Sequence, residues 1–268
     1  MFKEEQKTFA PLMVSETSRN LRRVFHLSEE MKALAPKNSD YKPLRAHIIG
    51  AGTMGADIAS WCVVSGMDVT LQDMSIEQIE KAQKGAKKLF RKRLKKPVAI
   101  EAAMARLTAD PDGKGVKRAD IIIEAIVENL EIKQELFKNL EKEIKPGAVL
   151  ASNTSSLSLE EIASSMEDEG RLIGIHFFNP VAQMPLVEVV SSEKSRKEEV
   201  EKGCAFVTKI NKYPLIVKSC KGFLVNRVLA PYMMESIRQL DEGVPPEKID
   251  QAALDFGMPM GPIELIDV

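Results

Sequence analysis

Hydrophobic and polar positions follow two alternating periods between residue 44 and about residue 221. Short apolar runs, typical of buried strands, lie at residues 45–50, 67–73, 121–125, 148–152, 172–177, 186–190 and 215–217. Segments with helical spacing of apolar residues lie between them, at residues 54–65, 76–96, 99–106, 130–144, 159–165 and 195–209. The alternation predicts an α/β protein with a doubly wound, Rossmann-type sheet, parallel and covered by helices on both faces.

The two ends of the chain follow a different pattern. Residues 15–35 place Leu21, Val24 and Phe25 near one helical face, and a polar, proline-containing stretch then breaks the periodicity. From Phe223 onward the pattern is helical. We therefore expect three parts: an N-terminal helix and linker over residues 1–43, a dinucleotide-binding domain over residues 44–221, and the start of an all-helical domain over residues 222–268, which we expect to be truncated.

A glycine-rich segment, Gly50-Ala51-Gly52-Thr53-Met54-Gly55, follows the first strand predicted in this region and opens the next helix. In a dinucleotide-binding turn the first glycine permits the tight turn, the second lets the backbone approach a pyrophosphate, and the third lets helix and sheet pack closely. The N–H groups at the start of that helix face the phosphates. We predict that the cofactor contacts include Gly50, Gly52, Thr53, Met54 and Gly55.

An acidic residue ends the second predicted strand of this unit. Asp73 stands where such folds accept hydrogen bonds from the adenosine ribose hydroxyls. A carboxylate there repels a 2′-phosphate, and no arginine follows Asp73 directly. The sequence therefore favours NAD over NADP as cofactor.

One imidazole and one carboxylate stand out in the second half of the sheet region. His176 ends an apolar strand, Glu188 lies inside the next one, and a short proline-marked connection joins the two. If the strands pair, the two side chains come within hydrogen-bonding reach, and a histidine oriented by a carboxylate is a ready general base. His47 has no comparable context, and we interpret it as structural.

From Leu44 to Val268 the chain resembles the L-3-hydroxyacyl-CoA dehydrogenases. The resemblance rests on the glycine segment and on five further motifs: Glu124-Ala125-Ile126-Val127-Glu128-Asn129, Ser152-Asn153-Thr154-Ser155-Ser156-Leu157, His176-Phe177-Phe178-Asn179-Pro180, Gly222-Phe223-Leu224-Val225-Asn226-Arg227 and Gly261-Pro262-Ile263-Glu264-Leu265. It implies that His176 is the catalytic base and that Glu188 orients it. It also implies substrate contacts from Ser155 and Asn226, cofactor contacts from Glu128, Lys133 and Asn179, and a contact between Lys96 and the CoA moiety.

Several of these residues have simpler interpretations. Ser155 lies in a good turn sequence, Asn226 suits a helix N-cap, and Glu188 alone suits an edge strand that avoids aggregation. Lys133 fits an exposed helix position equally well, and Lys96 ends a basic run typical of a solvated helix face.

The bulk composition excludes several classes of protein. Lys and Arg number 38 against 39 Asp and Glu, a net charge of −1, so nothing points to nucleic acid or an anionic membrane as the main partner. We find no apolar run long enough to span a bilayer, no signal peptide, and no metal or disulfide spacing among the three cysteines. We therefore predict a cytoplasmic protein without a metal.

The resemblance is strongest to the dehydrogenase part of bacterial multifunctional β-oxidation subunits. It implies NAD-dependent oxidation of (S)-3-hydroxyacyl-CoA, a preceding hydratase domain, a possible thiolase subunit as partner, and a possible homodimer through the helical region. We expect the chain to be a fragment of such an enzyme. A 3-hydroxybutyryl-CoA dehydrogenase and an inactive NAD-binding or structural protein on the same scaffold are the alternatives.

Overall fold

The computed structural model describes residues 2–34 and 40–266, with side chains from residue 7 onward. Part of the linker predicted at the end of residues 1–43 lies outside these described residues. The chain divides into two compact units, residues 1–219 and residues 220–268.

The first unit contains one eight-stranded sheet with the strand order β3-β2-β1-β4-β5-β6-β7-β8. Its strands are β1 (Arg45–Ile49), β2 (Asp68–Gln72), β3 (Leu107–Ala109), β4 (Ile121–Glu124), β5 (Val149–Ser152), β6 (Leu172–Phe177), β7 (Leu186–Ser191) and β8 (Tyr213–Lys218). The Rossmann-type α/β fold is confirmed. The expected all-parallel sheet is not, because β6 and β7 pair antiparallel while the other neighbours are parallel. A short turn between them leaves no room for a crossover helix.

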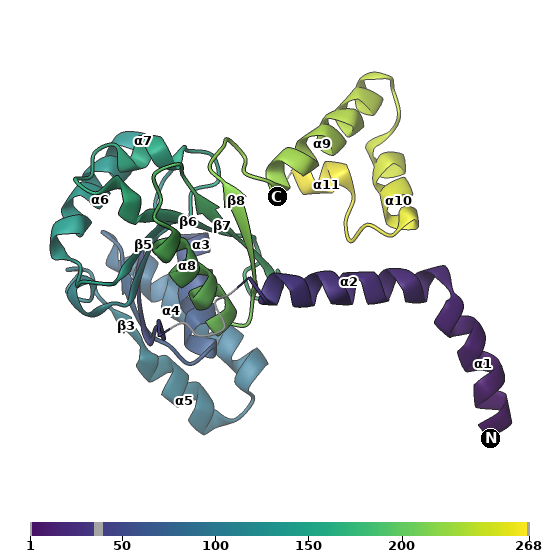
Figure 1. Ribbon diagram of the computed structural model, residues 1–268, viewed down its shortest axis with the longest axis horizontal. Coiled ribbons are helices and arrows are strands. Elements are labelled where there is room, and N and C mark those ends of the chain that lie inside the picture. The colour runs from purple at the N-terminus through teal and green to yellow at the C-terminus, as the bar shows by residue number, and fades with distance from the viewer. Residues whose placement is uncertain (1, 35–39, 267–268) are drawn as a thin grey trace. The chain divides into compact units, whose positions relative to one another are not determined.

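Helices fill most connections between the strands (Figure 1). The first unit has α1 (Phe2–Val14), α2 (Glu16–Lys32), α3 (Thr53–Val64), α4 (Ile76–Leu94), α5 (Pro97–Arg106), α6 (Leu130–Glu143), α7 (Leu159–Ala163) and α8 (Lys197–Lys209). The periodicity did not predict α1 or the three-residue β3. Pro97 both ends the basic helix pattern and starts α5, because proline is tolerated in the first helical turn.

The two faces of the sheet carry different side chains. Apolar residues of one face form the large core with α3, α4 and α8, including Ile173 and Ile175 of β6. Side chains alternate along a strand, so Gly174 and His176 point to the opposite face. A Cβ on Gly174 would lie 3.4 Å from Leu159 of α7, which identifies α7 as a helix on that second face.

The second unit is helical, as expected from residue 222 onward. It contains α9 (Val225–Asp241), α10 (Pro246–Phe256) and α11 (Pro262–Ile266). Asp250 of α10 ties the last two together, because its Oδ1 accepts a hydrogen bond from the Ile263 N–H at 2.8 Å. Among the described residues no helix combines the length and the apolar character needed to cross a membrane.

His47 lies inside β1, within the predicted strand, and it is fully buried. Its Nδ1 lies 2.7 Å from Thr70 Oγ1 and its Nε2 lies 2.9 Å from Gln72 Oε1. A neutral imidazole with the proton on Nε2 satisfies both bonds, since Nδ1 can then accept from the hydroxyl. Burial lowers the pKa of His47 below its ordinary value, although Gln72 and Asp110 act in the opposite direction.

We predict that His47 makes the fold sensitive to acid. Because its folded-state pKa lies below that of the unfolded chain, this contribution to stability is present above about pH 6.5 and is lost as the pH falls through and below that value. Urea unfolding at pH 7.5 and pH 5.5 should show a smaller acid loss in His47→Gln than in the wild type. His26→Gln, at an exposed position of α2, should keep the wild-type acid loss; equal losses in all three proteins would contradict the assignment.

Candidate functional site

The glycine turn joins β1 to α3 with very little space around two of its glycines. Gly50 has φ = 103°, and a Cβ there would lie 2.5 Å from the Ala125 carbonyl oxygen. A Cβ on Gly55 would lie 1.8 Å from the Gly50 carbonyl oxygen, so the first turn of α3 packs directly on the turn. Around Gly52, by contrast, a Cβ would meet no described atom within 4 Å. The turn is thus rigid at both ends and open at its middle.

The start of α3 is suited to an anion. Its N-cap is Gly52, which provides no side-chain cap, so the first N–H groups of the helix are left for a ligand. Thr53 is exposed and Met54 half-buried in that first turn. The open middle glycine and this helix end fit the pyrophosphate of a dinucleotide.

Asp73 fixes the same turn through hydrogen bonds to backbone N–H groups. Its Oδ2 accepts a hydrogen bond from the Ala51 N–H at 2.7 Å, and its Oδ1 accepts one from the Ser75 N–H at 2.9 Å. Each carboxylate oxygen has a second lone pair for a ligand hydroxyl. The half-buried Asp73 is therefore in a position to shape the turn and to accept hydrogen bonds from a ribose.

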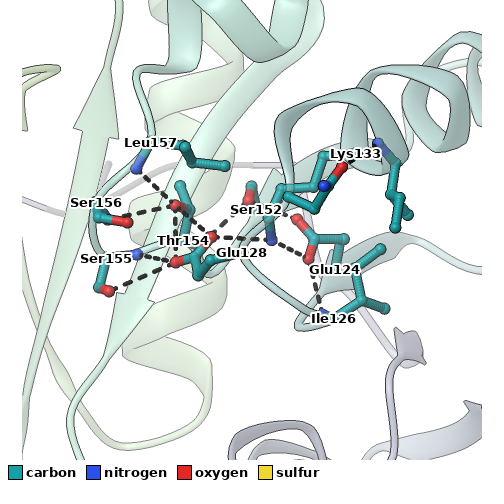
Figure 2. A network of polar contacts seen from close by, with 11 residues as sticks. Glu124, Ile126, Glu128, Lys133, Ser152, Thr154, Ser155, Ser156 and Leu157 are labelled. Atoms are coloured by element: carbon teal, nitrogen blue, oxygen red, sulfur yellow. Dashed lines mark hydrogen bonds and ion pairs between the residues drawn. The ribbon is translucent and has the colours of Figure 1, made fainter.

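A buried charge network lies at the carboxyl ends of β4 and β5 (Figure 2). Glu124, fully buried at the end of β4, accepts hydrogen bonds from Lys133 Nζ at 2.5 Å, from Ser152 Oγ at 2.6 Å and from the Ile126 N–H at 2.8 Å. Lys133, only 1% exposed on α6, lies 3.4 Å from Glu128 as well. A buried carboxylate is tolerated here because an ammonium and two further donors compensate it.

Glu128 carries the network to the loop after β5. Its Oε1 accepts a hydrogen bond from the Ser155 N–H at 2.8 Å, and the Thr154 hydroxyl lies 3.0 Å from both carboxylate oxygens (Figure 2). Thr154 Oγ1 in turn accepts from the Leu157 N–H at 3.0 Å. The loop that presents Ser155 is thus fixed by side chains, and Ser155 itself is half-buried at its start.

The predicted histidine and carboxylate meet across β6 and β7. The antiparallel register places His176 directly opposite Glu188, and His176 Nδ1 lies 2.8 Å from Glu188 Oε2. Glu188 is fully buried, and His176 is 6% exposed. Because Nδ1 faces the carboxylate, Nε2 is the ring nitrogen on the side of the imidazole away from Glu188. This is the arrangement of a general base with an orienting acid.

The loop after β5 also supports the strand that carries the histidine. Asn153 Oδ1 accepts a hydrogen bond from the Phe177 N–H at 2.9 Å, next to His176. Phe178 lies edge-on to the imidazole, with 4.7 Å between the ring centroids. The imidazole is therefore contacted by Glu188 and by an aromatic ring, and Asn153 fixes the backbone next to it.

Three predicted residues lie outside these networks. Asn179 is exposed just after β6, and Lys96 is exposed as the N-cap residue of α5. Asn226 belongs to the second unit, where it is half-buried in the first turn of α9.

The structure decides three of the simpler interpretations. Glu188 is no edge-strand residue, because β8 covers the far side of β7. Lys133 is no exposed lysine, because its ammonium is buried between two carboxylates. Asn226 is no N-cap, because Leu224 holds that position of α9.

Glu124, Ser152 and Thr154 were not singled out from the sequence, although they complete the network. A carboxylate that ends a run of three isoleucines is the signal that could have identified Glu124, because a charge at the end of a buried strand needs a partner. Nothing in the sequence gives the partner, since Lys133 lies on a helix with many other lysines and glutamates.

The described residues also contain features unrelated to this site. A cavity of about 230 Å³ lies at the opposite, amino-terminal ends of β1 and β2, and its lining includes Arg45, Asp68 and Arg106. Within residues 2–34 and 40–266 no group of three or more His, Cys, Asp and Glu side chains could hold a metal ion.

Comparison with known proteins places both units in one family. Residues 45–220 match the NAD-binding domain of the 3-hydroxyacyl-CoA dehydrogenases, and residues 222–268 match the C-terminal domain of the same family. Among solved structures, 3-hydroxybutyryl-CoA dehydrogenase from Escherichia coli is 39% identical with a TM-score of 0.79, covering 84% of this chain and 49% of that one. The (S)-3-hydroxybutyryl-CoA dehydrogenase from Ralstonia eutropha is 34% identical with a TM-score of 0.78, covering 84% and 81%.

Longer relatives match almost the whole chain. The fatty acid oxidation complex subunit alpha of Vibrio cholerae is 37% identical over 269 residues, which cover 98% of this chain and 38% of that protein. The subunit of the same name from Shewanella baltica is 40% identical over 270 residues, with the same coverage. The chain thus spans 38% of the length of these curated relatives.

The glycine turn predicts a separation of folding from cofactor binding. Gly52→Ala should leave the free energy of unfolding within about 0.5 kcal/mol of wild type, because its Cβ meets open space, but should weaken NAD binding about tenfold or more. Gly55→Ala should lower stability by about 1–3 kcal/mol, because its Cβ collides with the Gly50 carbonyl. Urea unfolding and calorimetric titration with NAD measure both; tight NAD binding by a folded Gly52→Ala would contradict this placement.

The buried network predicts that Lys133 is important for stability. Lys133→Met should destabilise the fold by about 3–5 kcal/mol, because it leaves the buried Glu124 carboxylate without its ammonium. Lys138→Met, at an exposed position of the same helix, should change stability by less than about 0.5 kcal/mol. Equal unfolding free energies for the two variants would show that the ion pair adds nothing.

Proposed function

The chain belongs to the 3-hydroxyacyl-CoA dehydrogenase family, and we propose that it carries the site that oxidises (S)-3-hydroxyacyl-CoA to 3-oxoacyl-CoA with NAD. The observation that carries this proposal is the His176–Glu188 pair, with 2.8 Å between Nδ1 and Oε2, in the same unit as a dinucleotide turn. The turn indicates redox chemistry, and the pair provides the proton transfer that oxidising an alcohol requires.

The residues of the turn fit the cofactor. Gly52 and the first N–H groups of α3 would bind the pyrophosphate, Thr53 and Met54 would line it, and Asp73 would accept the ribose hydroxyls. When bound, NAD supplies the acceptor for the hydride that leaves the alcohol carbon.

His176 would perform the proton transfer. Its Nε2 takes the proton of the C3 hydroxyl as the C3 hydride leaves, and the carbonyl forms from the electron pair of the broken O–H bond. Glu188 fixes the tautomer through Nδ1 and stabilises the imidazolium that results. In the reverse direction the imidazolium returns the proton to the oxygen of the forming alcohol.

The remaining predicted residues would position the two ligands. Ser155, on the loop fixed by Glu128, would donate a hydrogen bond to a substrate oxygen. Asn226 would also hydrogen-bond a substrate group. Glu128 and Asn179 would lie along the cofactor, and Lys96 would contact the CoA moiety. Lys133 would contribute through Glu128, since its ammonium is already paired in the described structure.

The longer relatives lead us to propose a larger protein around this site. They are named as alpha subunits of a fatty acid oxidation complex, and this chain matches 38% of their length. We infer a β-oxidation role in the cytoplasm, with a hydratase domain in the same polypeptide, a thiolase subunit as partner and a homodimer through the helical region.

A short-chain enzyme is the second candidate, because two of the solved structures cited above are named 3-hydroxybutyryl-CoA dehydrogenases. Rates of NADH formation with hydroxyacyl-CoA substrates of four to sixteen carbons separate the two. A preference confined to the four-carbon substrate would favour the second.

We predict that His176→Ala lowers kcat by about 10²–10⁴-fold while NAD binding is retained, because only the general base is removed. Glu188→Gln should also lower kcat, because an amide cannot stabilise the imidazolium, and His26→Ala should leave turnover unchanged. NADH absorbance follows the rates, and calorimetry follows NAD binding.

Two results would contradict the proposal. Near-normal turnover in His176→Ala would make the base assignment wrong. A folded wild-type chain that binds NAD but oxidises no hydroxyacyl-CoA would favour an inactive NAD-binding protein.

A further inference from the structure

Hydrogen bonds from backbone and side chains hold the segment that joins the two strands of the His176–Glu188 pair. It runs from Phe178 to Pro185, between β6 and β7, and we call it the connector. The Pro180 carbonyl accepts from the Gln183 N–H at 2.9 Å and the Met184 N–H at 3.1 Å, and the Pro185 carbonyl accepts from the Tyr213 N–H at 2.8 Å. Two cationic side chains, Lys212 and Arg93, donate hydrogen bonds to further carbonyls of the connector.

Lys212 supplies the strongest of these bonds. It precedes β8, is only 3% exposed, and its ammonium donates to the Val181 carbonyl and to the Met184 carbonyl, each at 2.6 Å. Charge-assisted hydrogen bonds of this length are about twice as strong as neutral ones. One side chain thus bridges both ends of the turn in the connector.

The ammonium also lies on an aromatic ring of the cofactor-binding helix. Lys212 Nζ is 4.5 Å from the ring centroid of Trp61 on α3, within cation–π range. The Trp61 indole N–H donates to the Ile210 carbonyl at 2.9 Å, which fixes the ring. Arg93 of α4 lies 5.5 Å from the same ring and donates to the Ala182 carbonyl at 2.7 Å.

Burying an ammonium in this place has a cost. Burial, and after it the positive charge of Arg93, lowers the pKa of Lys212 from 10.5 to about 8. If Lys212 only filled space, replacing it with methionine would cost no stability. The two carbonyl bonds explain why a cation is kept here.

We propose that Lys212 is a positioning residue that holds the connector, and with it the register of His176 against Glu188, on the cofactor-binding helix through Trp61. It touches neither ligand; it acts through the backbone of Val181 and Met184. The inference rests on the proposed function for its effect on turnover, but its structural part does not.

The structural part is tested without turnover. In Lys212→Met the amides of Gln183 and Met184, which donate to Pro180, should exchange hydrogen at least about tenfold faster than in the wild type at pH 7, because connector opening becomes easier. Lys209→Met, at an exposed position three residues earlier, should leave their exchange unchanged. Unchanged exchange in a folded Lys212→Met would overturn the proposal.

Turnover gives the second measurement. Lys212→Met should lower kcat about 10- to 100-fold with little change in KM for NAD, because loss of alignment affects the reacting geometry more than binding. Lys212→Arg should restore part of kcat, since it keeps the charge and the donors. If the wild type shows no turnover, the proposed function fails. The exchange result still decides whether Lys212 holds the connector.

Trp61 is the only tryptophan of the chain, so its fluorescence reports on the charge above it. Wild-type emission should show one transition near pH 8 as Lys212 loses its proton, and Lys212→Arg should show none. The charged and titratable groups around it are Arg93, Asp57 beside Val181, and Cys62, whose pKa burial raises to about 12. Lys212→Arg leaves all three in place, so it isolates the part of the transition that belongs to Lys212.

Global unfolding does not account for such a transition. The folded-state pKa of Lys212 lies below 10.5, so between about pH 8 and 10.5 the folded chain binds fewer protons and this group's contribution to stability rises with pH. If Lys212→Met does not fold, Arg93→Gln takes its place in the exchange experiment, because Arg93 is exposed and makes one hydrogen bond to a connector carbonyl. Hydrogen exchange at the Gln183 and Met184 amides should then rise by a smaller factor. No rise in Arg93→Gln would overturn the proposal.

Discussion

The antiparallel pairing of β6 with β7 is the constraint on which the site depends. It is the one antiparallel step between neighbours in the described sheet, and its register places His176 opposite Glu188. Because side chains alternate along a strand, a slip of one residue would send one of the two to the opposite face. The fully buried Glu188 carboxylate would then lose its partner, so the pairing that joins the histidine to the carboxylate also compensates a buried charge.

The polar side chains of the site gather on one face of the sheet, and the register explains how. In the strand register Glu124 lies opposite Ser152, and Ser152 lies opposite Gly174. His176 follows Gly174 by two residues in β6 and therefore faces the same side of the sheet. The absence of a side chain on Gly174 lets Val190 approach, since a Cβ there would come within 2.7 Å of it. The opposite face stays apolar and forms the core with α3 and α8, so the sheet separates the chemistry from the packing that supports it.

Sequence patterns predicted most of the strands and helices because burial imposes a period of two or 3.6 on residues near in sequence. They predicted the glycine turn for the same local reason. They could not place Lys133, because whether a helical lysine is buried depends on a carboxylate nine residues away on another element. The burial and contacts of Lys212 could not be predicted either, because its partners are backbone carbonyls that carry no sequence signal. The three-residue β3 is too short for any period to show.

Trp61 and Lys212 give a physical reason why the two halves of the site stay aligned. Hydride transfer needs the base and the cofactor at fixed separation, yet β1 and β6 are distant neighbours in the sheet order, with β4 and β5 between them. Helix α3, whose N-cap is Gly52, carries Trp61 on its third turn, and the Lys212 ammonium over that ring donates to the connector that follows His176. The link passes over the apolar face and not through the polar network of Glu124 and Lys133. The glycine turn and the His176–Glu188 pair are therefore linked through the packed apolar core and a charge-assisted contact to the backbone.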